Sequence, residues 1–238
     1  MLSSLNNFKD LTIAIIPARA GSTRIKNKNL CRIGNDSLIT NSLKTCKKSG
    51  IFDQIIVSTD SKEIAKHSEN FSSLIHNRSQ ANAQSLSSTE SVISEIFNDL
   101  PELFDKQVLI YLIQCTSPFL KEEDLIRSYE LIKSNKFNYD CLVSGYLFNK
   151  FIWEKDTKTK NLIPLNYNPQ ERPRSQDKSP LFVENGAFYV FGASNFKLTK
   201  CRIHGRVASF EMDEKLSIDI DSQEDLNYAI YLSDYLKG

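Results

Sequence analysis

A short apolar run at residues 13–16 ends at Pro17 and opens into a turn rich in small and cationic side chains. The cations of this basic loop are Arg19, Arg24, Lys26 and Lys28. Gly21 permits a positive φ and a close backbone approach. The loop therefore predicts a site for a polyanion such as a triphosphate, which free amides, the Ser22 hydroxyl and the cations would bind. The alternative is a basic surface loop after a core strand. Neither G-x-x-x-x-G-K-[ST] nor G-x-G-x-x-G occurs here.

A second set of chemically capable residues lies near the end of the sequence. Asp219 and Asp221 alternate with Ile218 and Ile220. This alternation predicts a strand whose two carboxylates face one side while the isoleucines fill the core. Neighbouring carboxylates repel one another unless a cation lies between them, and Mg²⁺ prefers carboxylate and phosphate oxygens. We therefore expect a magnesium site, the alternative being that one aspartate caps the following helix.

Together, the basic loop and the aspartate pair predict a reaction class. A nucleoside triphosphate would place its phosphates over Gly21 and Ser22, with Arg19 and Lys28 neutralising their charge. Mg²⁺ at Asp219 would bridge phosphate oxygens. Phosphoryl and nucleotidyl transfer depend mainly on positioning and charge neutralisation, so an obvious nucleophile is not required. This interpretation requires Lys28 and Asp219 to face each other across one crevice.

Alternating strands and helices must position these residues. Apolar runs predict strands at 13–16, 55–57, 71–75, 108–113, 141–144, 184–191, 207–210 and 216–221. Helical spacing and capping residues predict helices at 37–49, 89–100, 122–134, 193–198 and 222–236, with a further helix around 64–65. Asp60 with Glu63, and Ser222 with Asp225, have the spacing of helix N-terminal caps. The alternation through residue 144 predicts an α/β fold with a mostly parallel, doubly wound sheet.

The pattern breaks between Gly145 and Val183, a segment too long for a simple connection. Phe148, Phe151 and Trp153 make it more apolar than a free flap requires, so a contact with a second subunit would cover them. The alternative is that they pack on their own core. We accordingly expect an α/β domain formed by residues 1–144 and 184–238, with residues 145–183 as an inserted arm.

Composition excludes several classes of function. The chain has 238 residues and a formal net charge of +1, which argues against a nucleic-acid partner. No apolar run approaches the length of a membrane span, and residues 1–10 lack the features of a signal peptide. The five cysteines and three histidines are scattered, which predicts reduced thiols in a cytoplasmic protein and no zinc site.

Several motifs together carry a family resemblance. The sequence Ile15-Ile16-Pro17-Ala18-Arg19-x-Gly21-Ser22, with Lys28-Asn29, resembles the signature loop of the acylneuraminate cytidylyltransferases. The similarity continues, in the family's order, through Ile56-Val57-Ser58-Thr59-Asp60, Gln114-x-Thr116-Ser117-Pro118, Asn185-Gly186-Ala187 and Ser217-Ile218-Asp219-Ile220-Asp221. It therefore spans most of the chain.

The resemblance implies a Rossmann-like nucleotide-diphospho-sugar transferase fold and a Mg²⁺-dependent reaction. CTP and a nonulosonic acid would give a CMP-sugar and pyrophosphate, with the anomeric hydroxyl attacking the α-phosphorus. Arg19, Lys28 and Asp219 would be catalytic, and Asp219 and Asp221 would hold the metal. The implied nucleotide-binding residues are Ala18, Arg19, Gly21, Ser22, Lys28, Asn29, Arg78, Ser88 and Thr89. The implied sugar-binding residues are Gln114, Thr116, Ser117, Arg174, Gln176 and Tyr189.

Members of this family commonly dimerise by exchanging an arm, so the resemblance also implies a homodimer formed through residues 145–183. Lys150 stands near the position of the arm's lysine. Cys115 replaces a common proline and Leu120 a frequent basic residue, and both departures leave the identity of the sugar open among sialic, legionaminic, pseudaminic and Kdo-type acids. Two alternatives stay open: a nucleotidyltransferase that uses another nucleotide or acceptor, and an inactive nucleotide-sugar binding protein.

Overall fold

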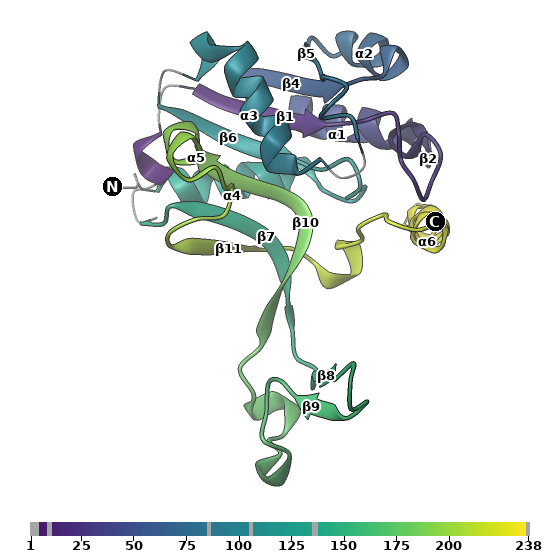
Figure 1. Ribbon diagram of the computed structural model, residues 1–238, viewed down its shortest axis with the longest axis vertical. Coiled ribbons are helices and arrows are strands. Elements are labelled where there is room, and N and C mark those ends of the chain that lie inside the picture. Colours follow the sequence, from purple (N-terminus) through teal and green to yellow (C-terminus); the bar gives the residue numbers. More distant parts are fainter. Residues whose placement is uncertain (1–4, 9–10, 85–86, 105–106, 135–137, 237–238) are drawn as a thin grey trace.

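The computed structural model describes residues 5–8, 11–84, 87–104, 107–134 and 138–236. A seven-stranded sheet crosses the molecule in the order β11-β7-β10-β6-β1-β4-β5 (Figure 1). Its strands are β1 (Leu11–Pro17), β4 (Gln54–Thr59), β5 (Leu74–Asn77), β6 (Val108–Ile113), β7 (Cys141–Phe148), β10 (Leu181–Gly192) and β11 (Val207–Glu211). All neighbours pair in parallel except β10, which is antiparallel to both β6 and β7. The prediction of a mostly parallel α/β sheet is confirmed.

Helices cover both faces of the sheet because successive strand residues point to opposite sides. The helices are α1 (Leu38–Ser49), α2 (Lys62–Glu69), α3 (Thr89–Asp99), α4 (Glu122–Lys133), α5 (Ala193–Thr199) and α6 (Gln223–Tyr235). Ala14 and Ile16 of β1 join a core cluster with residues of α1, α2, α4 and α6. Ile13 and Ile15 join the opposite cluster, with residues of α3 and α5. Every residue of β6 is buried, as expected for a central strand covered on both faces. Among the described helices, none is long and apolar enough to cross a membrane.

The helix caps explain where several elements begin and end. The Ser37 hydroxyl accepts from Thr40 N at the start of α1, and Gly50 closes that helix with a φ of 66°. Ser222 and Asp225 form a capping box on α6, as expected. The prediction of an Asp60 cap is wrong, because Ser61 caps α2 by accepting from Ile64 N. The predicted strand at 71–75 begins only at Leu74, since a turn with Ser72 at a φ of 59° precedes it.

Residues between β7 and β10 form a projection from the sheet (Figure 1). The outer parts of β7 and β10 pair as a ribbon, from Gly145 opposite Glu184 to Phe148 opposite Leu181. Beyond this ribbon lies a hairpin of β8 (Trp153–Lys155) and β9 (Leu162–Pro164), followed by short 3₁₀ turns at Pro169–Glu171 and Ser175–Asp177. We call residues 149–180 the projecting hairpin.

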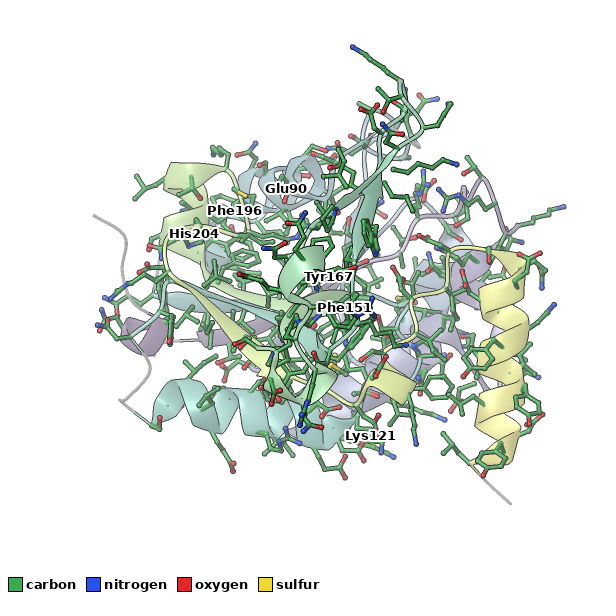
Figure 2. The ribbon with its side chains drawn as sticks, turned by 90° about the horizontal axis from the view of Figure 1, so that it is seen from below. Glu90, Lys121, Phe151, Tyr167, Phe196 and His204 are labelled. Atoms are coloured by element: carbon green, nitrogen blue, oxygen red, sulfur yellow. The ribbon has the colours of Figure 1, made fainter. Side chains whose placement is uncertain are left out.

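The aromatic residues of the projecting hairpin pack on each other rather than on the main core. Phe151 and Tyr167 lie side by side with ring centroids 4.4 Å apart (Figure 2), and Trp153 meets Tyr167 edge-on at 5.6 Å. The Arg172 guanidinium lies 4.2 Å from the centre of the Phe151 ring. The remaining small elements are the β2 (Arg32–Ile33) and β3 (Asp36–Ser37) pair and 3₁₀ turns at Leu5–Asn7, Lys28–Leu30, Pro101–Leu103 and Glu214–Leu216.

Candidate active site

A polar cavity of about 390 Å³ lies beyond the carboxyl ends of β1 and β6, where ligands of open α/β sheets gather. The basic loop forms one wall, and the start of α3 with the loop after β5 forms another. Its lining includes Arg19, Ser22, Arg24, Lys28, Asn29, Arg78, Asn82, Ser88, Thr89, Gln114, Thr116 and Asp221. We call it the first cavity.

Hydrogen bonds fix the basic loop at both ends. Ala18 N donates to Ser58 O at 2.9 Å, and Ala20 N donates to Asp60 Oδ1 at 2.7 Å. The Asn29 amide returns to Arg19 O at 3.0 Å. The expectation of free amides at Gly21 and Ser22 is wrong for Ser22, whose N–H donates to Ala20 O at 3.1 Å, and the N–H groups of Ala18 and Ala20 also have partners. Side chains must supply most of the charge that faces a ligand.

Gly21 also differs from expectation, because its φ is not in the left-handed region. A Cβ added there would meet nothing within 4 Å. Asn27 supplies the left-handed residue of the loop, with a φ of 54° immediately before the turn that begins at Lys28. The loop thus reverses direction at Asn27.

The basic loop closes directly on the acidic segment. Lys28 Nζ donates to Ile220 O at 2.6 Å and to Asp221 Oδ1 at 3.3 Å. Arg24 reaches the other oxygen of Asp221 at 3.4 Å. The Lys28 side chain is only 16% exposed, so its ammonium is held between the two segments. The early cationic loop and the late acidic segment meet in the structure, but Lys28 and Asp219 line two adjoining cavities rather than the single crevice that was expected.

The acidic segment is not the strand that alternation predicted. Residues 217–221 lack strand pairing, and Ile220 N donates instead to Thr116 O at 2.9 Å. Ile220 is fully buried and anchors the segment, while Asp219 and Asp221 line two adjacent cavities. Ser222 caps α6, so the alternative of a capping role for Asp221 is also wrong. Burial raises the pKa of Asp219, the charge of Asp221 raises it further, and a hydrogen bond from the Thr116 side chain opposes this.

A second cavity, of about 270 Å³, adjoins the first and shares Gln114 with it. Its lining is Gln114, Tyr146, Glu184, Asn185, Gly186, Tyr189, Ser217 and Asp219. The Tyr189 hydroxyl donates to Glu184, and burial followed by this carboxylate raises the pKa of Tyr189 to about 12. Tyr189 therefore stays protonated at neutral pH, and its one O–H is donated to Glu184.

Asn185 and Gly186 form the wall beside Asp219. The Asn185 amide donates to Ser217 Oγ at 2.9 Å and its oxygen accepts from Ser144 Oγ at 2.8 Å. Gly186 has a φ of 71°, and a Cβ there would lie 3.7 Å from Asp219 Oδ2. The turn at Asn185-Gly186 thus brings backbone close to the carboxylate.

Arg78 directly follows β5 and lines the first cavity. Its Nε donates to Ser58 Oγ at 3.2 Å and its Nη2 to Ser58 O at 2.9 Å. Burial lowers the pKa of the Arg78 guanidinium, while Asp60 and Glu95 oppose that shift. A buried guanidinium with few negative partners is a strong recognition group for anions and for carbonyl oxygens.

The structure brings most of the expected site residues together. The first cavity gathers Arg19, Ser22, Lys28, Asn29, Arg78, Ser88, Thr89, Gln114, Thr116 and Asp221, and the second gathers Gln114, Tyr189 and Asp219. Ala18, Gly21 and Ser117 lie nearby but line neither cavity. Arg174 and Gln176 lie exposed on the projecting hairpin and also line neither.

Some site residues were not identified from the sequence, notably Asp60, Asn82, Tyr146 and Glu184. Asp60 follows a buried strand directly, so the rule that polar residues at strand ends face the ligand could have found it. No comparable signal marked Tyr146 or Glu184. Their positions depend on the antiparallel pairing of β7 and β10.

The mixed sheet and its two adjoining cavities define an α/β protein of the nucleotide-sugar transferase fold. The structure is similar to a solved CMP:2-keto-3-deoxy-manno-octonic acid synthetase complexed with CTP, with a TM-score of 0.66, 13% identity and coverage of 95% of this chain and 100% of that one. It is also similar to a 4-diphosphocytidyl-2C-methyl-D-erythritol synthase from Anaerococcus prevotii, with a TM-score of 0.62, 15% identity and coverage of 96% and 99%.

The family model of the cytidylyltransferases matches residues 13–236, and the chain belongs to that family. N-acylneuraminate cytidylyltransferase A of Danio rerio is 34% identical over 87% of this chain and 47% of its own length. The chain thus spans about half the length of the vertebrate relatives that it matches. Pseudaminic acid cytidylyltransferase of Campylobacter jejuni is 29% identical over 91% of this chain and 94% of its own length. The family resemblance inferred from the motifs is confirmed.

Proposed function

We propose that this protein is a cytidylyltransferase that activates a nonulosonic acid, converting CTP and the sugar acid to a CMP-sugar and pyrophosphate. The observation that carries the proposal is the pair of adjoining cavities. One is lined by cations suited to a triphosphate, the other mostly by polar side chains suited to a polar acceptor, and Gln114 belongs to both. The names of the relatives support CTP and an acidic nine-carbon sugar as the two substrates.

In this proposal, Arg19, Ser22 and Lys28 bind the triphosphate, while Asn29, Arg78, Ser88 and Thr89 contact the cytidine. The anomeric oxygen of the acceptor forms a bond to the α-phosphorus, and the bond from that phosphorus to the bridging oxygen of the β-phosphate breaks. The acceptor proton passes to Asp219, which lines the second cavity. Arg19 and Lys28 neutralise the charge that develops on the departing pyrophosphate.

The acidic segment fits a divalent cation, because it offers two carboxylates at the junction of the cavities. Asp219 and Asp221 would hold Mg²⁺ in the proposed enzyme. When bound, the ion would neutralise phosphate charge during transfer. Lys28 and Arg24 already offset the charge of Asp221, which keeps the two carboxylates compatible at close range.

The projecting hairpin supports a homodimer. Leu162, Ile163 and Leu165 are 59%, 47% and 58% exposed, an apolar surface that a partner subunit would cover. Arg174 and Gln176 line neither cavity of their own chain, so a sugar-binding role would require them to reach a neighbouring site. Leu162→Asp combined with Ile163→Asp is expected to yield monomers in light scattering. Leu198→Asp, at an apolar residue that is 69% exposed elsewhere, is the matched control.

The five cysteines are all free thiols, which supports the proposal of a reducing, cytoplasmic environment. The test of function is pyrophosphate release with CTP, UTP, GTP and ATP, each offered with sialic, legionaminic, pseudaminic and Kdo-type acids under Mg²⁺. We expect turnover with CTP and one of these acids, abolished by EDTA. Preference for another nucleotide would replace the proposal with its nearest alternative. Nucleotide binding without turnover on any acid would indicate a binding protein.

A further inference from the structure

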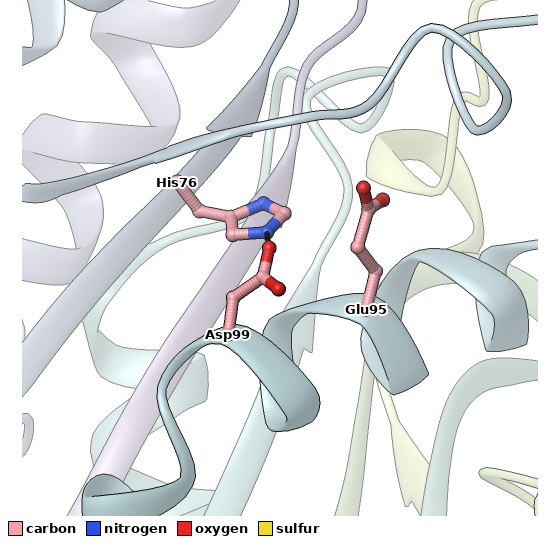
Figure 3. A group of neighbouring side chains, drawn as sticks. All are labelled: His76, Glu95 and Asp99. Atoms are coloured by element: carbon pink, nitrogen blue, oxygen red, sulfur yellow. Dashed lines mark hydrogen bonds and ion pairs between the residues drawn. The ribbon is translucent and has the colours of Figure 1, made fainter.

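Behind Arg78, a chain of hydrogen bonds runs away from the first cavity toward the end of α3. Ser58 Oγ, which accepts from Arg78 Nε, also lies 3.0 Å from His76 Nδ1. The other ring nitrogen of His76 lies 3.0 Å from Asp99 Oδ2. Figure 3 shows the Asp99 carboxylate directed at the ring from the last turn of α3. Ser58 is fully buried and His76 is nearly so.

With a neutral His76 ring, the chemistry of the four groups gives every bond a direction. Arg78 Nε can only donate, so Ser58 Oγ accepts from it, and the unprotonated Nδ1 accepts the Ser58 hydrogen. A carboxylate can only accept, so His76 carries its proton on Nε2 and donates it to Asp99. Both ring nitrogens of His76 and the Ser58 hydroxyl are thus paired in the interior, where an unpaired group is costly.

This network controls how Arg78 is presented. The two bonds to Ser58 occupy Nε and Nη2, which leaves Nη1 for a ligand. Without an acceptor at His76, the hydrogen of the Ser58 hydroxyl would be unpaired in the interior. A rotation of the Ser58 side chain toward another partner would then take Oγ away from Arg78 Nε, and the guanidinium would lose one of its two anchors. Glu95, one turn before Asp99 on α3, accepts from Ser79 N at 2.8 Å and from Asn82 Nδ2 at 2.7 Å. Helix α3 therefore holds both Arg78 and the loop that follows it.

His76, Glu95 and Asp99 could also be considered as metal ligands, because one donor atom of each lies within 4.8 Å of the others. The contacts of these side chains favour a hydrogen-bonded network instead. Nε2 of His76 is engaged by Asp99, and both Glu95 oxygens are engaged by Ser79 and Asn82. A metal ion would have to displace these bonds.

We propose that His76 is a positioning residue for nucleotide recognition, which holds Arg78 in place through the Ser58 hydroxyl. This inference rests on the proposed function, since it assumes that Arg78 contacts the nucleotide. Asp99 fixes the tautomer of His76 and anchors the far end of the network. Ser58, His76 and Asp99 do not line the first cavity.

The test compares His76→Phe, His76→Asn and Ser58→Ala in the full chain. The phenylalanine keeps the ring shape and removes both hydrogen bonds, whereas the asparagine can retain an acceptor for Ser58. We expect His76→Phe and Ser58→Ala to raise the CTP dissociation constant and KM about tenfold, with kcat changed less than about threefold. His76→Asn should recover most of the affinity. His67→Phe is the matched control, because His67 also bonds a hydroxyl, Thr40 Oγ1 at 2.7 Å, outside the cavity lining.

A double-mutant cycle with Arg78→Ala separates positioning from general destabilisation. Once Arg78 is truncated, His76→Phe should cause no further loss of CTP affinity. Additive losses, unchanged affinity in both His76 variants, or a kcat loss that follows the melting temperature would overturn the inference. Stabilisation of the wild type by Zn²⁺, absent in His76→Phe, would overturn it in favour of a metal site. A wild type that binds CTP without turnover would contradict the proposed function alone, because the affinity measurements would still test His76.

Discussion

Replacing Lys28 with methionine should separate catalysis from stability. The change removes the bonds of Lys28 Nζ to Ile220 O at 2.6 Å and to Asp221 at 3.3 Å. Asp221 is 59% exposed and retains Arg24, so solvent and the remaining cation compensate for much of the loss. We expect the free energy of unfolding to fall by about 1 kcal/mol, which corresponds to roughly 2–4 °C for a chain of this size.

The effect on the reaction should be larger, because the ammonium faces the position expected for the departing pyrophosphate. Losing one preorganised charge of this kind costs about 2–4 kcal/mol in the transition state, or roughly 30- to 1,000-fold in kcat/KM. Steady-state pyrophosphate release and thermal unfolding would measure the two effects separately. Lys28→Arg should retain part of the activity, and Lys26→Met is the control, since Lys26 lies in the same loop but does not line the cavity. A loss of less than about threefold in Lys28→Met would refute the role assigned to this lysine.

Four further predictions concern the site. The kcat/KM for CTP should rise as the pH rises through the pKa of Asp219, and this step should be absent in Asp219→Asn. Because the folded-state pKa of Asp219 is raised, this residue contributes stability at low pH that is lost as the pH rises through that pKa. Asp219→Asn should therefore raise the melting temperature at pH 7 but not at pH 3. Gly186→Ala, at a φ of 71° and with its new Cβ 3.7 Å from the Asp219 carboxylate, should destabilise the fold by about 1–2 kcal/mol and lower activity. Asp60→Ala should raise KM, because Ala20 N would lose its hydrogen bond to the Asp60 carboxylate. Ser61→Ala, which removes the cap of α2, should cost about 1 kcal/mol of stability with KM unchanged. The opposite pattern would contradict both assignments.

Elements could be predicted where the local sequence signals, such as an apolar run or helix caps, all agree. The apolar run of β6 has no polar position to expose, so it had to be a central strand. Helix α1 combines a Ser37 cap, an apolar face and a terminal Gly50, three signals that agree. The basic loop was also found, because cations following a buried strand have few structural reasons to cluster there.

The wrong predictions concern segments whose backbone groups form hydrogen bonds with residues distant in the sequence. Alternation of aspartate and isoleucine at 217–221 is typical of a strand, but Ile220 donates its N–H to Thr116 and accepts from Lys28. Those bonds pair the backbone groups that would otherwise bond to a neighbouring strand. Asp60 has cap spacing, yet its carboxylate binds Ala20 N instead, and the next residue, Ser61, caps α2. Such choices depend on residues distant in sequence, which local patterns do not encode.

The direction of β10 explains why the second cavity was the hardest part to predict. In a wholly parallel sheet, Asn185 and Gly186 at the start of a strand would lie at the edge opposite Gln114, which follows β6. Because β10 runs antiparallel, Phe188 pairs with Ile113 and Gln114 N donates to Ala187 O at 3.1 Å, so the start of β10 lies at the ligand edge. The end of β7 reaches the same edge, since Gly145 pairs with Glu184. The projecting hairpin must therefore leave the sheet beside Tyr146 and Glu184, which line the second cavity. The topology of the sheet thus places the base of the hairpin next to the proposed acceptor side of the site.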